Sequence, residues 1–409
     1  NNMTASAHAA GDPSRRGAPA ALFTEQEASV VQEHEVREIR EIASNFRFAG
    51  AYLGAERCEN GHINDTYIVA TALPGGGVRR YVLQRINHNV FKSPEGVMQN
   101  IRRVTQHLRR KVIERGGDPE REIMNLVPTR DESFLYKSES GEYWRSYLYV
   151  EGARTYNAVE EPRHFFGAGE AFGRFQSLLS DFPAETLIET IPKFHDTPSR
   201  LKDLVSAVER DAANRAKDVK QEIEFALERA GDAPVVVDLL AQGEIPLRVT
   251  HNDTKLNNVL IDEVTGQGIC VLDLDTVMPG STLYAFGDAI RFGASTAAED
   301  ERDLSKVGID LDLYRQFTRG YLSTASDFLT ERELELLPFS AKLLAYELGM
   351  RFLTDHLNGD VYFRIHRPNH NLDRARAQFR LAESIEQHMD EMLRIVEEES
   401  ARVPAERRS

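Results

Sequence analysis

Two short apolar segments between residues 249 and 279 each run into acidic and amide side chains, and this arrangement constrains the fold more than any other feature of the chain. The first segment runs into His251, which is followed by Asp253 and, five residues later, by Asn258. The second segment ends on Asp273. Short apolar runs of this kind are typical of buried strands. We therefore expect two strands that deliver these side chains to one point.

The spacing of this motif is typical of kinase-type phosphoryl transferases. Their reaction places two negatively charged partners in line and neutralises charge on oxygen. We interpret Asp253 as the base that orients an acceptor hydroxyl, and His251 as a brace for the loop. Asn258 and Asp273 offer the hard oxygen ligands that Mg²⁺ prefers, so we predict ATP and Mg²⁺ as cofactors. The alternative is that Asp and Asn lie here only because they favour turns.

Length, composition and charge restrict the class of protein. With 409 residues and 41% hydrophobic content, the chain can form two lobes with their own cores. No apolar run approaches the ~18 residues of a membrane span, and no signal-peptide pattern is present, so we expect a cytoplasmic protein with no membrane partner. Cys58 and Cys270 are too few for a disulfide framework. The formal charge of −15 argues against a nucleic-acid partner. We expect a monomer that acts on a small molecule.

Hydrophobic periodicity predicts a sheet-rich region followed by a helical one. Residues 1–30 lack an apolar period and are predicted to be a disordered tail. A helix is expected at 35–49, and another at 94–115 inside the sheet region. The predicted strands are 51–57, 66–72, 80–87, 124–128, 134–137 and 142–150. After a break at Glu151, helices are expected at 162–179, 198–230, 234–242 and in four stretches after Gly308.

These elements predict an α+β, bilobal, protein-kinase-like fold. We expect a small antiparallel-sheet, nucleotide-binding lobe at 31–150 and a mostly helical lobe at 151–400 that carries the catalytic loop. The nucleotide is expected between the lobes.

Two other features have simple structural interpretations. Gly167, Gly169 and Gly173 have the wrong spacing for a dinucleotide-binding loop and are interpreted as helix-packing glycines. His195 and Asp196 offer a possible metal site, but a helix N-cap is the favoured interpretation of this pair.

Nine stretches of the sequence resemble the aminoglycoside-phosphotransferase-like small-molecule kinases, from about residue 46 to residue 393. The stretches are GHINDTY (61–67), YVLQRIN (81–87), FHDTPSR (194–200), LRVTHNDTKLNNVL (247–260), LDLDTVMPGS (272–281), FGDAIRFGAST (286–296), LLPFSAKLL (336–344), GMRFL (349–353) and DVYF (360–363). The later stretches closely resemble the bacterial N-acetylhexosamine 1-kinase branch. The resemblance implies phosphorylation of the anomeric (C1) hydroxyl of N-acetylglucosamine or N-acetylgalactosamine, which gives the α-1-phosphate.

The resemblance also implies roles for single residues. It assigns the catalytic base and the metal ligands as above, and it makes Asp288 the acid that anchors the catalytic-loop backbone. It places four residues in the hexosamine pocket: His62, Phe292, Arg351 and Tyr362. An aromatic face can pack on a pyranose ring, and Arg351 can donate to sugar oxygens. The alternatives are that His62 braces a turn, that Phe292 is a core residue, and that Arg351 pairs with Glu347 one helical turn away.

The phosphate-binding elements depart from the protein-kinase pattern. No G-x-G-x-x-G loop is present, and only Gly61 in the first turn lets the backbone approach phosphate. The usual strand lysine falls at Gln84. A neutral amide cannot supply the charge of lysine, so we expect the metal, with Arg85 or Lys255, to neutralise the phosphates. Glu151, at the break between the lobes, is the remaining candidate for nucleotide binding.

Other functions remain open at this stage. The same fold could phosphorylate an aminoglycoside, choline, a plain hexose or another small alcohol, although Arg351, and His62 if protonated, would repel a polycation. A protein of a different class, a nucleotide-binding regulator that has lost catalysis, should lack the base or a metal ligand. Both kinds of residue are present in this sequence.

Overall fold

The structure is a computed structural model of the chain that describes residues 28–29, 33–58 and 63–406. Most of the predicted tail, at 1–27, and the candidates Gly61 and His62 lie outside the described residues. The chain forms two compact units. The first contains the residues up to 87 together with 127–149, and the second contains 88–126 and the residues from 150 onward. Each unit is described by itself.

The first unit is a six-stranded antiparallel sheet in the order β1-β2-β3-β4-β6-β5, with one helix, α1 (Glu33–Ala43). The strands are β1 (Ala28–Ser29), β2 (Ala51–Cys58), β3 (Asp65–Ala72), β4 (Val78–Ile86), β5 (Tyr136–Lys137) and β6 (Tyr143–Leu148). Side chains on successive residues of a strand point to opposite faces. One face of this sheet presents Val69 and Leu83, and these pack with Ile39 and Ile42 of α1 in a single buried core.

The strand predicted at 124–128 does not form. In place of a ladder, the described residues make isolated backbone contacts here: the Val127 N–H donates to the Ser146 carbonyl, the Pro128 carbonyl accepts the Arg47 N–H, and Thr129 bridges to Phe46 outside the sheet. Pro128 lies between Val127 and Thr129 and has no N–H, so a continuous ladder of hydrogen bonds cannot run through it. The predicted strands at 51–57, 66–72 and 80–87 do form, with ends that shift by one or two residues.

The helix predicted at 94–115 is α2 (Pro94–Glu114), and it belongs to the second unit. Its Asn100 side chain donates to the carbonyls of Ile188 and Val277, over 2.7 and 3.3 Å, and accepts the Ile188 N–H. These buried hydrogen bonds explain why residues 88–126 group with the helices, in contrast to the lobe of 31–150 expected from sequence order.

The second unit is mostly helical. Besides α2 it contains α3 (Pro162–Leu178), α4 (Thr197–Arg210), α5 (Lys220–Glu228), α6 (Val235–Ala241), α7 (Thr282–Gly293), α8 (Leu311–Ala325), α9 (Glu331–Asn358), α10 (His370–Gln387) and α11 (Met389–Glu406). The four helices expected after Gly308 are confirmed as α8 to α11. The single helix expected at 198–230 is two helices, because Asp211 adopts the left-handed conformation (φ 43°) and ends α4.

Helix α7 was not expected from the sequence. Its residues from Thr282 to Arg291 are all buried. A helix that is buried on every side lacks the apolar stripe by which surface helices are recognised. The Ser281 side chain caps its first turn by accepting the Leu283 N–H.

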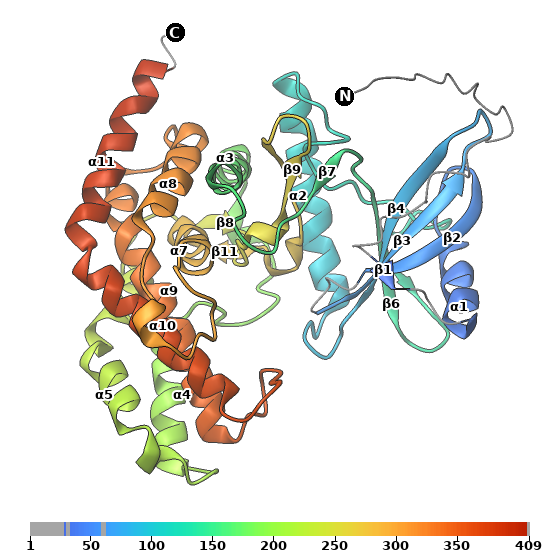
Figure 1. Cartoon of the computed structure of the whole chain (residues 1–409). Coiled ribbons are helices and arrows are strands. Elements are labelled where there is room, and N and C mark those ends of the chain that lie inside the picture. Colours follow the sequence, from blue (N-terminus) through green and yellow to red (C-terminus); the bar gives the residue numbers. More distant parts are fainter. Residues whose placement is uncertain (1–27, 30–32, 59–62, 407–409) are drawn as a thin grey trace, which may run out of the picture. The chain divides into compact units, whose positions relative to one another are not determined.

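The glycines of α3 allow it to lie closely against α8 (Figure 1). A Cβ atom on Gly169 would collide with the Phe317 carbonyl of α8, and one on Gly173 with the Tyr321 carbonyl. Gly320 of α8 faces the Phe166 carbonyl in the same way. The interpretation of Gly169 and Gly173 as helix-packing residues is therefore confirmed.

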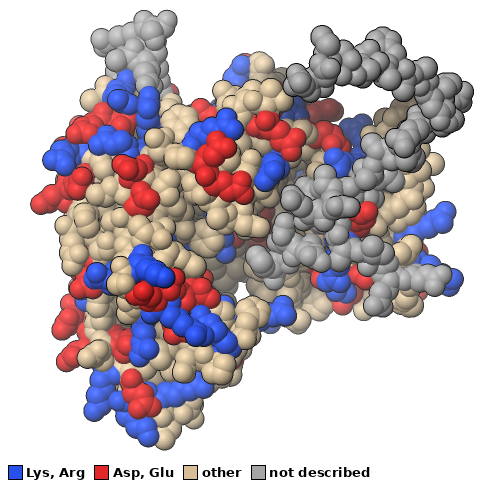
Figure 2. All heavy atoms as spheres, viewed as in Figure 1, with Lys and Arg blue, Asp and Glu red and all other residues tan. Residues whose placement is uncertain are grey.

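Charged side chains of both signs are interspersed over α8 and α11, as Figure 2 shows. Arg315 of α8 joins the two helices by ion pairs with Glu398 and Glu399, at 2.8 and 2.9 Å. Within the described part of the chain, no helix combines the length and the apolar character needed to cross a membrane.

Candidate active site

The first predicted segment forms β8 (Arg248–Thr250), which pairs with β11 (Met278–Gly280), and the second forms β10 (Gly268–Val271). The two segments meet in the second unit, where His251, directly after β8, hydrogen-bonds at 2.7 Å to the carbonyl of Leu272, directly after β10. Strand β9 (Val259–Asp262) pairs with β10 (Gly268–Val271), and just before β9 the Asn258 carbonyl accepts the Leu272 N–H at 2.7 Å. Asp273 follows Leu272 directly and adopts the left-handed conformation (φ 54°), which Asp tolerates better than most residues. Asn258, just before the start of β9, and Asp273, just after the end of β10, are therefore held close together by the backbone.

His251 braces the catalytic loop. Its ring is fully buried, and its Nδ1 accepts the Asp253 N–H at 3.2 Å. The other nitrogen, Nε2, therefore carries the proton and donates to the Leu272 carbonyl at 2.7 Å. Burial lowers the pKa of His251 and favours the neutral ring. The residue thus links the Asp253 segment to the Asp273 segment, as its place in the motif predicts.

A second anchor holds the loop on α7. The Thr254 N–H donates to the carboxylate of Asp288 at 3.1 Å, and Arg291 pairs with the same carboxylate at 3.0 Å. Burial raises the pKa of Asp288, but the Arg291 charge and other nearby cations outweigh it and hold the pKa below its usual value. An ionised, buried carboxylate fixes the loop backbone, which confirms the structural role expected for Asp288.

Two candidate residues, Asn258 and Lys255, lie next to Asp253, and a third, Phe292, lies next to Lys255. The Asn258 side chain donates to the Asp253 carbonyl at 2.8 Å. The Lys255 ammonium lies 3.8 Å from the Asp253 carboxylate, whose charge raises the pKa of Lys255. The same ammonium lies 5.4 Å from the centre of the Phe292 ring. Phe292, at the end of α7, is only partly buried, so it is not an interior core residue.

Arg351 and Tyr362 form a second group on α9 and the loop that follows it. The guanidinium of Arg351 lies 5.8, 5.8 and 5.4 Å from the ring centres of Phe194, Tyr362 and Phe363. Burial and the neighbouring Arg200 charge lower the pKa of Arg351. Tyr362 is 69% exposed, so its ring is available to a ligand. The Arg351 guanidinium thus lies among three aromatic rings, and the ring of Tyr362 is the exposed one.

The proposed pairing of Arg351 with Glu347 is replaced by another arrangement. Glu347 is fully buried and binds His195 Nδ1 at 2.7 Å and the Thr197 hydroxyl at 2.9 Å. His195 Nε2 in turn lies 3.4 Å from the Asn252 carbonyl in the catalytic loop. Among the described residues, no carboxylate lies within ion-pair distance of the Arg351 guanidinium. Glu347 and His195 thus connect α9 to the residue that precedes Asp253.

The N-cap interpretation of Asp196 is confirmed. Its carboxylate accepts the Ser199 N–H at 3.1 Å and caps α4. His195 is part of the buried connection to Glu347 and is not a metal ligand paired with Asp196.

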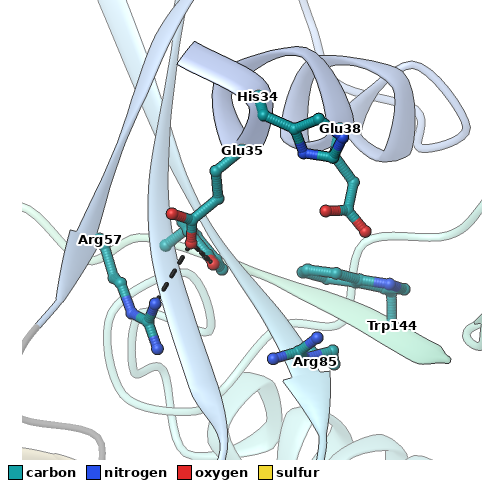
Figure 3. A pocket seen from close by; sticks show the side chains of 7 residues that line it. His34, Glu35, Glu38, Arg57, Arg85 and Trp144 are labelled. Carbon is teal, nitrogen blue, oxygen red and sulfur yellow. Dashed lines mark hydrogen bonds and ion pairs between the residues drawn. The ribbon is translucent and has the colours of Figure 1, made fainter. Parts of the chain in front are cut away.

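In the first unit, Gln84 and Arg85 point to opposite faces of the sheet. Gln84 donates to the Thr66 hydroxyl at 3.1 Å and accepts from Arg145 Nε at 3.0 Å. Arg85 lies on the face covered by α1, where it forms an ion pair with Asp65 (Figure 3). The two neighbours therefore cannot act on the same phosphate group.

A cavity of about 330 Å³ lies between α1 and the sheet (Figure 3). Its sheet side is lined by Arg57, Tyr67, Arg85 and Trp144, and its helix side includes Glu35. Three of the charged side chains that line it are paired, because Arg57 binds Glu35 at 3.2 Å and both arginines bind Asp65. The catalytic-loop residues do not line this cavity.

A family model described as the phosphotransferase enzyme family matches residues 54–317, which include the catalytic loop, Asp273 and α7. The chain belongs to this phosphotransferase family. Its fold is similar to that of the amicoumacin kinase hAmiN, solved with AMP-PNP, Ca²⁺ and Ami, at 14% identity and a TM-score of 0.52, covering 87% of this chain and 94% of that one. It is also similar to an aminoglycoside phosphotransferase from Alicyclobacillus acidocaldarius, at 13% identity and a TM-score of 0.53, covering 91% and 99%. The predicted α+β, kinase-like fold is confirmed.

Glu151, the remaining candidate for nucleotide binding, lies away from the Asn258 segment. Glu151 lies just before β7 (Ala153–Arg154), whose pairing with β9 sets Ala153 opposite Asp262. Its carbonyl accepts from Arg121, which also binds Asp262 at 2.9 Å. Glu151 is therefore at the opposite end of β9 from Asn258.

Two sets of polar contacts were not predicted from the sequence. Arg145 is the cross-strand neighbour of Gln84, and Glu347 with His195 supports the catalytic loop. The sequence signal for Arg145 is a cation inside an apolar strand, and the signal for Glu347 is an acid on the buried face of a helix.

Proposed function

We propose that the protein is an ATP- and Mg²⁺-dependent kinase that phosphorylates the anomeric C1 hydroxyl of an N-acetylhexosamine, N-acetylglucosamine or N-acetylgalactosamine. The observation that carries the choice of acceptor is the group formed by Arg351, Tyr362 and Phe363. The Arg351 guanidinium forms no ion pair with a described carboxylate, so it can donate to the acetamide and ring oxygens of a neutral sugar, while the tyrosine ring offers the sugar an apolar face.

The residues present fit a nucleotide-bound Mg²⁺ ion. The side-chain nitrogen of Asn258 donates to the Asp253 carbonyl, so the side-chain oxygen is the atom that could bind the metal ion. Asp273 supplies a carboxylate next to it, and both are hard oxygen donors. Among the described residues, no three His, Cys, Asp or Glu side chains form a metal site on their own. When bound with nucleotide oxygens, the ion would neutralise charge on the phosphates.

In this proposal different side chains carry out different parts of the reaction. Asp253 accepts the proton of the C1 hydroxyl as that oxygen bonds to the γ-phosphorus of ATP and the bond to ADP breaks. Lys255, held by the Asp253 charge, stabilises negative charge on the transferring group.

Another small alcohol is the second candidate acceptor, and the similar solved kinases act on antibiotics according to their names. Two observations disfavour a cationic antibiotic or choline here. Arg351 lies at the pocket, and Arg200 adds a second positive charge close to it. A cationic acceptor would be repelled by both.

The test is the product formed with Mg-ATP and a panel of free acceptors. We expect turnover with N-acetylglucosamine or N-acetylgalactosamine, and phosphorus NMR should show coupling of the phosphate to H1 of the α anomer. The panel includes glucose, choline and kanamycin, and Asp253→Asn protein is the background control. Equal rates with glucose would reject a role for the acetamide, turnover only with kanamycin or choline would replace the sugar, and no turnover with any acceptor would favour a regulatory protein.

A further inference from the structure

The peptide group that joins Asn252 to Asp253 lies between two buried histidines. Its N–H, which belongs to Asp253, donates to His251 Nδ1 at 3.2 Å, and its carbonyl, which belongs to Asn252, lies 3.4 Å from His195 Nε2. Asn252 adopts the left-handed conformation (φ 66°), and its side chain donates to the Thr276 carbonyl at 2.9 Å. Because the Asp253 side chain starts at the end of this peptide group, any rotation of the group would move the proposed base.

Both ring nitrogens of His195 face hydrogen-bond acceptors. Nε2 faces the Asn252 carbonyl, and Nδ1 lies 2.7 Å from the Glu347 carboxylate, which also accepts the Thr197 hydroxyl at 2.9 Å. Burial raises the pKa of Glu347, but the charges of His195 and of nearby arginines outweigh burial and hold the pKa below its usual value. An ionised carboxylate only accepts, so Nδ1 donates to it. The arrangement therefore fits a ring that donates from both nitrogens.

We propose that His195 is a positioning residue for the base: by donating from Nε2 to the Asn252 carbonyl, it fixes the peptide group ahead of Asp253 in the orientation that turnover needs. The backbone is then held on both sides of Asp253, because the Thr254 N–H that follows it donates to Asp288 at 3.1 Å. The inference rests on the proposed role of Asp253 as the base, and it is independent of which acceptor is phosphorylated.

The same histidine links the base to the helix that carries the proposed acceptor pocket. Glu347 lies on α9, one helical turn before Arg351. Printed hydrogen bonds therefore run from this part of α9 through Glu347 and His195 to the carbonyl of Asn252. A residue placed in this way affects turnover through the position of Asp253, without contact to the nucleotide.

The alternative is that His195 serves only to pair the buried charge of Glu347. In that case the Nδ1 contact would matter, because a buried carboxylate without a partner is costly, and the Nε2 contact would add nothing. The two roles use different nitrogens of one ring, so substitution can separate them. The side-chain nitrogen of asparagine is bonded to Cγ, as Nδ1 is, and that of glutamine lies one atom further out, as Nε2 does.

The experiment compares His195→Asn with His195→Gln by steady-state kinetics, using the acceptor that the unmutated protein phosphorylates, and by thermal unfolding. His195→Asn keeps a donor for Glu347 and loses the donor to the Asn252 carbonyl. We expect its kcat to fall roughly 10- to 100-fold, the loss expected when a reacting group is slightly misplaced. Its Tm should change little, and its KM for Mg-ATP should stay within about twofold.

His195→Gln keeps the donor to the carbonyl and loses the donor to Glu347. It should retain a kcat at least about tenfold higher than that of His195→Asn, although its Tm should be lower because the buried carboxylate loses its partner. Both substitutions are repeated together with Glu347→Gln, which removes the buried charge, so that unfolding of one variant does not prevent the comparison. The control is His164→Asn on α3, where the buried His164 ring stacks on Tyr156; its kcat should be nearly unchanged.

Hydrogen exchange at the Asp253 N–H gives a second readout that needs no acceptor. Exchange should become faster in His195→Asn than in His195→Gln, because only the glutamine still holds the Asn252 carbonyl. The proposal is overturned if His195→Asn turns over normally, if the two variants lose kcat equally, or if kcat follows Tm in both. If the unmutated protein phosphorylates no acceptor, the proposed function fails, and equal exchange rates in the two variants would then overturn this inference separately.

Discussion

The Asn258 side-chain amide donates to the backbone carbonyl of Asp253, with nitrogen and oxygen 2.8 Å apart. This hydrogen bond joins the proposed metal ligand to the proposed base within one loop. A further hydrogen bond, from the Leu272 N–H to the Asn258 carbonyl, adds Asp273 to the same unit. The positions of the three residues are therefore coupled through the backbone, and a change at one of them should affect the others.

The first prediction separates the two uses of the Asn258 amide. Asn258→Ala removes both the oxygen ligand and the donor, so Mg²⁺-dependent ATP binding and kcat should both fall. Asn258→Asp keeps an oxygen ligand but sets a carboxylate against the Asp253 carbonyl. We expect it to retain most Mg-ATP affinity and to lose kcat by roughly tenfold or more, since a misplaced buried polar contact costs about 1–3 kcal/mol. Calorimetry and steady-state kinetics measure the two effects. Normal turnover by Asn258→Asp would show that this hydrogen bond is unimportant.

The second prediction concerns the base. Asp253→Asn keeps the size of the side chain and removes its ability to accept a proton, so kcat should fall by roughly 10²- to 10⁴-fold. The backbone N–H and carbonyl that bind His251 and Asn258 are unchanged, so the loop should keep its conformation. Nucleotide affinity should change little. A parallel loss of ATP binding would instead give Asp253 a structural role.

These loop residues could be predicted from the sequence because their arrangement is local. His251, Asp253 and Asn258 lie within one short segment, and Asp273 follows the next strand. Strands β3 and β4 of the first unit were also predictable, because they are joined by a glycine-rich turn and their apolar residues alternate or cluster in short runs. In both cases the signal and the contact span a few residues of sequence.

The contacts that were not predicted depend on distant parts of the chain. Arg145 meets Gln84 across 61 positions, and His195 meets Glu347 across 152. Strand register and helix packing decide these pairs, and neither is set by a local pattern. The same limit explains why Gln84 and Arg85 were considered together: their neighbouring positions in the sequence conceal their placement on opposite faces of β4.

The third prediction concerns the loop that carries Tyr362. The buried carboxylate of Asp355 accepts the N–H groups of Val361, Tyr362 and Phe363 at 2.9, 2.8 and 2.9 Å. It also accepts from Asn371 at 2.8 Å. Asp355 thus fixes the backbone of the proposed sugar-binding loop without belonging to the exposed part of the pocket.

Replacing Asp355 by Asn sets an amide donor against several backbone donors. We expect the KM for the sugar to rise roughly 5- to 50-fold, from a cost of about 1–2 kcal/mol, while the KM for ATP stays nearly constant. Asp312→Asn, at an exposed position on α8, is the control. An equal rise in both KM values, with a lower Tm, would show a general loss of stability in place of a local effect on the loop.

The last prediction tests the acceptor pocket directly. Arg351→Ala removes the guanidinium that lies among the rings of Phe194, Tyr362 and Phe363. If it donates to a sugar oxygen, its loss should cost about 1–3 kcal/mol, or roughly 5- to 150-fold in KM for N-acetylglucosamine. Arg351→Lys keeps the charge but not the planar pair of donors, so it should recover only part of the loss. Tyr362→Phe should have a smaller effect, because the exposed ring and its packing face remain.

The control for these variants is Arg332→Ala, which removes an arginine near the start of the same helix, α9, where its described ion-pair partner is the exposed Glu335. The unmutated protein is measured with N-acetylglucosamine and glucose in the same series. If Arg351 contacts the acetamide, Arg351→Ala should reduce the preference for N-acetylglucosamine over glucose as well as the affinity for the sugar. A variant that loses affinity equally for both sugars would place Arg351 at the ring hydroxyls. Unchanged kinetics with both sugars would remove Arg351 from the acceptor pocket, and the kinase fold and the catalytic loop would remain as described.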